Sequence, residues 1–202
     1  PAGRNSGFMI DLPHDLTSAD YGGGLDADLD QTEDNRLGIA HASKMATEYL
    51  LSDEAFLLSG KINGAATAKG QAHNENFAKH LTTMGEPYES LDAKQMREIT
   101  GSSYYQGGLF TPGTAMIQPA MYIRGVADGL RQDGVTIYEN SPVTALNNDG
   151  NWIVETPQGQ VSSPRVILAV NGHLNSFGYA KSRLMHVFTY ASMTRALTPQ
   201  EI

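Results

Sequence analysis

An uninterrupted apolar stretch places the narrowest limit on how this chain can fold. Residues 166–170 (VILAV) are five apolar residues in a row, and Asn171, Gly172 and His173 follow directly. A strand without alternation is typical of a sheet that is buried on both faces, and such strands often end at ligand sites in open α/β folds. Two interpretations stay open: the strand ends at a ligand, to which Gly172 allows close backbone approach, or it ends in an ordinary Asn-Gly turn.

The pattern along the rest of the chain predicts mixed helices and strands. Capping residues predict a short helix over 90–101, which Ser90 or Asp92 begins and Gly101 ends, and a helix that opens with Pro119. The other expected elements are an extended loop over 1–30, helices over 31–51 and 71–84, a hairpin over 55–70 with its turn at Asn63-Gly64, a strand over 135–140, a β-meander over 142–163, the strand over 165–170 and a long strand within 183–197.

Composition excludes several classes of function. The chain has no cysteine, so disulfides, thiolate metal sites and thiol catalysis are excluded. The net charge is −8 and the sequence shows no Lys/Arg cluster, which argues against nucleic acid and acidic membrane surfaces as partners. No apolar run reaches the length of a membrane span, and no secretory signal is visible at the start. We therefore expect a cytoplasmic protein.

Other motifs offer little chemistry. His73 and His80 lie seven residues apart with Glu75 between them, and because a third ligand is not evident we expect a solvated helix face and no metal site. The sequence contains neither a Gly-x-Ser-x-Gly elbow nor a P-loop, so it does not support a serine hydrolase or a nucleoside triphosphatase.

Four stretches together resemble the FAD-dependent amine and D-amino-acid oxidase family, in particular its γ-glutamylputrescine oxidoreductase-like branch. They are GRNSGF (3–8), the segment 107–146 that begins GGLFTPGTAMIQP, VILAVNGHLNS (166–176) and RLMHVFTYASMTRAL (183–197). The Gly-x-Gly-x-x-Gly fingerprint of the family is absent from the sequence, and so is the family's C-terminal stretch. Since the chain also opens without Met in a loop-like PAGRNSG, we expect an internal fragment, which binds FAD weakly or not at all.

The resemblance implies an α/β fold: part of a Rossmann-like FAD domain with a β-meander, and part of an antiparallel substrate-domain sheet. It implies a flavin-contacting loop region over 1–30, largely substrate or cap domain over 31–118, FAD domain over 119–180 and the start of the substrate sheet over 181–202.

The resemblance also implies FAD as the cofactor and a set of residues that contact it. These are Arg4, Asn5, Ser6, Gly7, Val143, Asn171, Gly172 and His173. Substrate contacts are expected from His14, His186 and Tyr190, with a surface turn as the alternative for His14. His186 and Tyr190 lie four residues apart and would share one face of a strand, with Arg195 on the other face. No catalytic residue can be named.

The implied activity is oxidation of the C–N bond of an amino acid or amine, in which hydride passes to flavin N5 and the imine product hydrolyses. A flavin enzyme of the same superfamily with other chemistry is a further alternative. The alternative from another class is a non-catalytic α/β fragment or interaction module that binds no cofactor. Bound flavin makes a preparation yellow, so colour distinguishes a flavin enzyme from a fragment or module that binds no cofactor.

Overall fold

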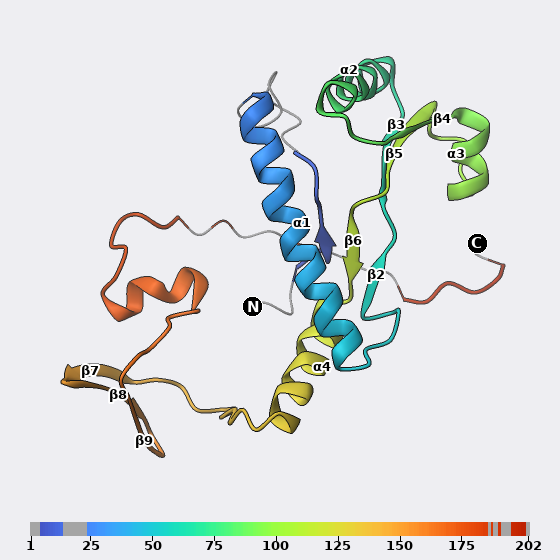
Figure 1. The fold of residues 1–202 in the computed structure, drawn as a ribbon. Helices are drawn as coiled ribbons and strands as arrows, with labels where there is room; N and C mark the ends of the chain where they lie inside the picture. The colour runs from blue at the N-terminus through green and yellow to red at the C-terminus, as the bar shows by residue number, and fades with distance from the viewer. Residues whose placement is uncertain (1–4, 14–23, 186, 188–189, 191–194, 201–202) are drawn as a thin grey trace. The chain divides into compact units, whose positions relative to one another are not determined.

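The computed structural model describes residues 5–13, 24–185, 187, 190 and 195–200 (Figure 1). Contacts within the chain define two compact units, residues 1–137 and residues 138–202. Helices and antiparallel strands occur together, which confirms the predicted mixed α/β class. The predicted assignment of four ranges to a FAD domain and a substrate domain stays a prediction.

The described part of the first unit contains four α-helices: α1 (Leu25–Glu48), α2 (Ala68–Met84), α3 (Ala93–Thr100) and α4 (Pro119–Gln132). Local signals account for several of their ends. Asp92 forms a capping box with Gln95, Gly101 ends α3 in the left-handed conformation, and Pro119 is the first residue of α4. The expected loop up to residue 30 is wrong for residues 25–30. These residues form the first turns of α1, where two acidic side chains favour the helix N-terminus.

Two antiparallel three-stranded sheets form the centre of the first unit. One has the order β1-β6-β2, from β1 (Phe8–Met9), β6 (Ala115–Ile117) and β2 (Phe56–Leu58). The other has the order β3-β5-β4, from β3 (Lys61–Ala65), β5 (Gly107–Thr111) and β4 (Glu89–Asp92). The predicted hairpin over 55–70 is therefore wrong. Asn63 and Gly64 lie inside β3, where they pair with β5 and do not turn.

Helices cover both faces of the β3-β5-β4 sheet (Figure 1). Two successive glycines in β5 let the helices come close: a Cβ on Gly107 would meet Gln71 of α2, and one on Gly108 would meet Met96 of α3. Because successive residues of a strand point to opposite faces, α2 and α3 lie on opposite sides. The α2 side holds a core cluster of Leu12, Phe77, Ala78, Leu81, Met84 and Leu109.

Helix α4 packs against α1 and the end of the β1-β6-β2 sheet. Tyr122 is buried and donates a hydrogen bond of 2.9 Å to the backbone oxygen of Ala42 in α1. Met9, Phe56 and Ile117 contact the same cluster, so one face of this sheet is covered. This packing fixes β6, the strand that borders the predicted flavin loop.

The second unit contains a β-meander, as predicted. Its strands β7 (Ala145–Asp149), β8 (Asn151–Thr156) and β9 (Gly159–Ser163) pair antiparallel in sequence order. The expected strand over 135–140 is not formed. Asn140 has a φ of 53°, a left-handed conformation that an extended strand excludes.

The apolar stretch over residues 166–170 is not a strand. Residues 165–170 have no regular structure, Ile167 is 90% exposed, and among the described residues no strand pairs with them. A strand needs a neighbour for its backbone hydrogen bonds, and apolar character does not replace one. Asn171 begins the 3-10 helix η1 (Asn171–Phe177). The described residues within 183–197 form no strand either, although part of that prediction lies outside the described residues.

Candidate functional site

The predicted flavin loop leads directly into β1. The Asn5 side chain accepts a hydrogen bond of 2.8 Å from the backbone N–H of Gly7, and Gly7 has a φ of 80°. The backbone oxygen of Gly7 accepts a hydrogen bond of 2.8 Å from Ile117. A Cβ at Gly7 would overlap the backbone oxygen of Ile117, because the two atoms would lie much closer than 3.0 Å, a separation below which Cβ contacts essentially never occur. The loop therefore requires glycine at this position. Arg4 lies outside the described residues.

A row of apolar side chains lies uncovered next to this loop. The strand register places Phe8 and Leu57 on either side of Met116, so these three side chains share one face of the β1-β6-β2 sheet. They are 53%, 49% and 42% exposed, respectively, whereas the opposite face packs on α1 and α4. Sequence analysis did not find this row, because it depends on pairing between strands that lie far apart in the chain.

A buried carboxylate follows β1. Asp11 is fully buried and accepts hydrogen bonds from Arg36 (3.1 and 3.3 Å) and from the hydroxyl of Thr114 (3.2 Å). Arg36 also donates two hydrogen bonds to Glu86, at 2.6 and 2.9 Å. The hydrogen bond to Glu86, more than the one to Asp11, raises the pKa of Arg36. A charge this deep needs such partners, since an unpaired buried carboxylate is costly.

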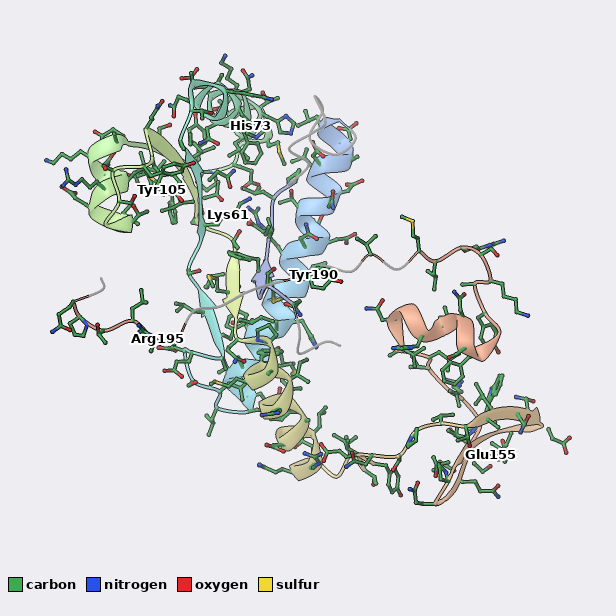
Figure 2. The ribbon with its side chains drawn as sticks, turned by 180° about the vertical axis from the view of Figure 1, so that it is seen from behind. Lys61, His73, Tyr105, Glu155, Tyr190 and Arg195 are labelled. Atoms are coloured by element: carbon green, nitrogen blue, oxygen red, sulfur yellow. The ribbon has the colours of Figure 1, made fainter. Side chains whose placement is uncertain are left out.

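Two further titratable side chains of this unit, Lys61 and His80, have buried neighbours. Lys61 lies at the start of β3 on the side that faces α2, with its ammonium 6.0 Å from the centre of the Phe77 ring (Figure 2). Burial lowers the pKa of Lys61, although attraction to Asp11 acts in the opposite direction. His80 contacts the fully buried Asp28 at 2.9 Å, so the prediction of a solvated helix face is wrong for His80. Among the described residues no group of three potential ligands could hold a metal ion.

In the second unit, Val143 lines a groove of about 380 Å³ together with Tyr138, Val154 and Val161. The groove has apolar walls and a polar edge formed by Ser141, Thr156 and the turn that joins β8 to β9. Its size and lining suit a flat, largely apolar ring.

The remaining predicted residues of this unit have different surroundings. Asn171, with a φ of 48°, Gly172 and His173 form the first turn of η1, and the backbone N–H of His173 donates to Val170. Tyr190 is 95% exposed, and neither Tyr190 nor Arg195 lies in a helix or strand (Figure 2). His14 and His186 lie outside the described residues.

The predicted cofactor residues are thus divided between the two units. Asn5, Ser6 and Gly7 lie together in the first, and Val143 and the start of η1 lie in the second. Sequence reasoning missed Asp11, Arg36 and Lys61. The only sequence signal for Asp11 is a single acidic residue among the apolar residues of MIDLP. This signal does not identify Arg36, which lies 25 residues further along the chain, as its partner.

None of the helices in the described part of the chain combines the length and apolar character needed to cross a membrane.

Known proteins resemble this chain both in sequence and in fold. The chain is 36% identical to γ-glutamylputrescine oxidoreductase of Escherichia coli over 113 residues, 56% of this chain and 26% of that protein. It is 39% identical to human mitochondrial dimethylglycine dehydrogenase over 78 residues, 38% of this chain and 9% of that protein. Glycine oxidase from Geobacillus kaustophilus has the same fold, with a TM-score of 0.68 at 16% identity over 88% of this chain and 47% of that one.

L-amino acid deaminase from Proteus myxofaciens also has this fold, with a TM-score of 0.64 at 16% identity over 88% of this chain and 39% of that one. Each of these matches spans less than half of the relative's own length. The family model for FAD dependent oxidoreductases matches residues 3–201, nearly the whole sequence. The chain therefore belongs to the FAD dependent oxidoreductase family.

Proposed function

We propose that the complete protein containing this chain uses FAD to oxidise the C–N bond of an amino acid or amine. The observation that carries this proposal is the family match over residues 3–201. The relatives and fold neighbours support the substrate class, because their names refer to amines, amino acids or N-methylated amino acids.

The residues of the first unit offer FAD a loop of fixed conformation next to an apolar surface. Gly7 leaves no space for a side chain on its β6 side, and Asn5 holds the backbone of the loop in a fixed turn. The uncovered row of Phe8, Met116 and Leu57 begins at the next residue and offers an apolar surface to a flat ring. We propose that the loop and this row contact the flavin end of FAD.

The second unit has surfaces of its own that fit parts of FAD. The groove at Val143 has the apolar walls that an adenine ring would occupy. The first turn of η1 places the backbone of Asn171, Gly172 and His173 close together in a tight 3-10 turn. We propose that both regions contact FAD in the complete protein.

FAD supplies the chemistry when bound: it accepts two electrons and a proton equivalent from the substrate carbon next to nitrogen. The protein's part is alignment and exclusion of water. The apolar row contributes an apolar surface, and the hydrogen bond from the Gly7 N–H to the Asn5 side chain holds the loop beside it in one conformation. In the overall reaction the substrate would lose a hydride from carbon to FAD and a proton from nitrogen to solvent, and water would then hydrolyse the resulting C=N bond to a carbonyl compound and an amine. The net charge of −8 favours a cationic amine substrate over an anionic one, although spread over the surface it adds only a weak bias.

The proposal is tested by releasing the bound cofactor from the purified complete protein and identifying the oxidised products from a panel of amino acids, N-methyl amino acids and polyamine derivatives. We expect FAD, and a carbonyl product from at least one member of the panel. Absence of flavin, or turnover restricted to substrates without a C–N bond, would contradict it.

Two matched variants test the proposed flavin surface. Phe8→Glu places a charge in the apolar row, whereas Leu37→Glu places one on an exposed, comparably apolar position of α1. We expect weaker FAD binding for the first variant alone. Equal FAD affinity in the two variants would show that the row is not the contact surface.

In the second unit, Gly172→Val is expected to lower flavin content more than it lowers the melting temperature of the apoprotein.

A further inference from the structure

The strand that carries the flavin loop is too short to hold its own position. β1 has two residues, Phe8 and Met9, and they pair with Met116 and Ala115 of β6. Most strands in proteins are longer, and a slip of one residue moves every side chain to the other face. Such a slip would bury Phe8 and expose Met9. Some other contact must therefore fix the register.

The contact lies two residues beyond β1. When the pairing of Met9 with Ala115 is continued, Asp11 comes to lie opposite Gly113. A Cβ on Gly113 would overlap the Asp11 carboxylate, so the carboxylate fills the space that this glycine leaves open. Thr114, the next residue, donates its hydroxyl to the other carboxylate oxygen. A shifted register would place Pro112 or Thr114 against the carboxylate, and neither leaves that space.

Arg36 holds the carboxylate in this position. It donates from Nε and Nη2 to one oxygen of Asp11, while Nη1 and Nη2 engage both oxygens of Glu86. The side chain of Asn35 adds a hydrogen bond of 3.1 Å to the backbone oxygen of Asp11. The following residues, Leu12 and Pro13, are also buried. Paired charges with several hydrogen bonds are directional, so they specify geometry as well as adding energy.

We propose that Asp11, Arg36 and Glu86 are positioning residues that set the register of β1 on β6 and so hold the Asn5–Gly7 loop and Phe8 ready for FAD. This inference rests on the proposed function for its link to FAD. The register role itself concerns the protein without cofactor.

The test uses three variants in the complete protein. Glu86→Gln weakens the ion pair between residue 86 and Arg36 and leaves the Asn5–Gly7 loop unchanged. Arg36→Met removes the guanidinium group that binds the Asp11 carboxylate. Asp128→Asn is the control, because it breaks an exposed ion pair between two residues of α4, Asp128 and Arg131. If Arg36→Met fails to fold because Asp11 is left unpaired, Glu86→Gln still decides the question, since it leaves the Asp11–Arg36 pair in place.

The first measurement is amide hydrogen exchange in the protein without FAD. The Ile117 N–H donates to Gly7, so its exchange reports on the register, whereas the Leu81 N–H near the C-terminal end of α2 reports on general stability. We expect exchange at Ile117 to accelerate by at least about tenfold relative to Leu81 in Arg36→Met, with a smaller change of the same sign in Glu86→Gln. Equal acceleration at both amides would mean that the cluster only adds stability, and would overturn the proposal.

The second measurement is the dissociation constant for FAD at a temperature where all variants are folded. We expect a loss of about tenfold for Arg36→Met and an unchanged value for Asp128→Asn. Unchanged affinity in Arg36→Met would overturn the link to FAD. If the unmodified protein binds no FAD, the proposed function fails, and the exchange ratio still decides whether the cluster sets the register.

Discussion

Gly7→Ala tests the claim that the predicted flavin loop depends on a glycine. Two costs can be worked out from the structure. A φ of 80° is left-handed, which costs an L-residue about 1–2 kcal/mol. The new Cβ would also overlap the oxygen of Ile117 and push apart the Ile117–Gly7 hydrogen bond, whose loss costs about 1 kcal/mol. We expect Gly7→Ala to lower the free energy of unfolding by about 2–3 kcal/mol.

Gly134→Ala separates the two costs. Gly134 has a φ of 88°, but a Cβ there meets nothing within 4 Å. This variant should lose only the conformational part, about 1–2 kcal/mol. The lower unfolded-state entropy of alanine is common to both variants and cancels in the comparison.

Urea unfolding followed by far-ultraviolet circular dichroism suits this test, because α1, α2, α3 and α4 all lie in the first unit. With a slope of about 1–3 kcal/mol per molar urea, Gly7→Ala should shift the midpoint by about 1 M or more. Trp152 is the only tryptophan and lies in β8 of the second unit, so its fluorescence should keep its midpoint in both variants. Equal shifts for Gly7→Ala and Gly134→Ala would refute the reasoning.

Three further predictions use other contacts of the first unit. Asp92→Ala removes the capping box of α3 and should cost about 1 kcal/mol in urea unfolding, and a cost near zero would show that the cap is not formed. The hydrogen bond to Asp133 raises the pKa of Tyr49 to about 12, so Asp133→Asn should let the Tyr49 phenol ionise at lower pH in a tyrosine NMR titration; an unchanged titration would rule out the contact. Burial lowers the pKa of Lys61 in the folded state, so the unfolded chain binds this proton more tightly at pH values between the lowered pKa and the ordinary value of 10.5. The free energy of unfolding should therefore rise with pH across this window relative to Lys61→Met, and parallel pH profiles for the two proteins would contradict this prediction.

Elements with strong local signals were predictable from the sequence. Asp92, Gly101 and Pro119 mark helix ends by their own conformational preferences, and the Gly-containing turns mark the meander. Elements that depend on distant partners were not predictable. Asn63-Gly64 is a turn signal, but pairing with β5 keeps both residues extended. Conversely, residues 166–170 carry the composition of a strand without a described neighbour to pair with.

The site was predictable to a smaller extent. The resemblance to known oxidases led to Asn5, Ser6 and Gly7, and the structure gives Gly7 a conformation that explains the glycine. The cluster at Asp11 and Arg36 was not visible, because each partner is an ordinary charged residue until the fold brings them together. Contacts of the predicted FAD residues with the cofactor stay predictions.

Anaerobic mixing of the flavin-loaded complete protein with candidate substrates tests the central claim most directly. Flavin loses its visible absorbance when it takes up two electrons, so bleaching reports the reductive half of the reaction without any assumption about the acceptor. The account predicts bleaching by at least one amino acid or amine, at a rate that rises with pH until the bound amine is deprotonated, because the neutral amine is the form that reacts. Bleaching by a 2-hydroxy acid or a reduced nicotinamide, with none by any amine, would contradict it.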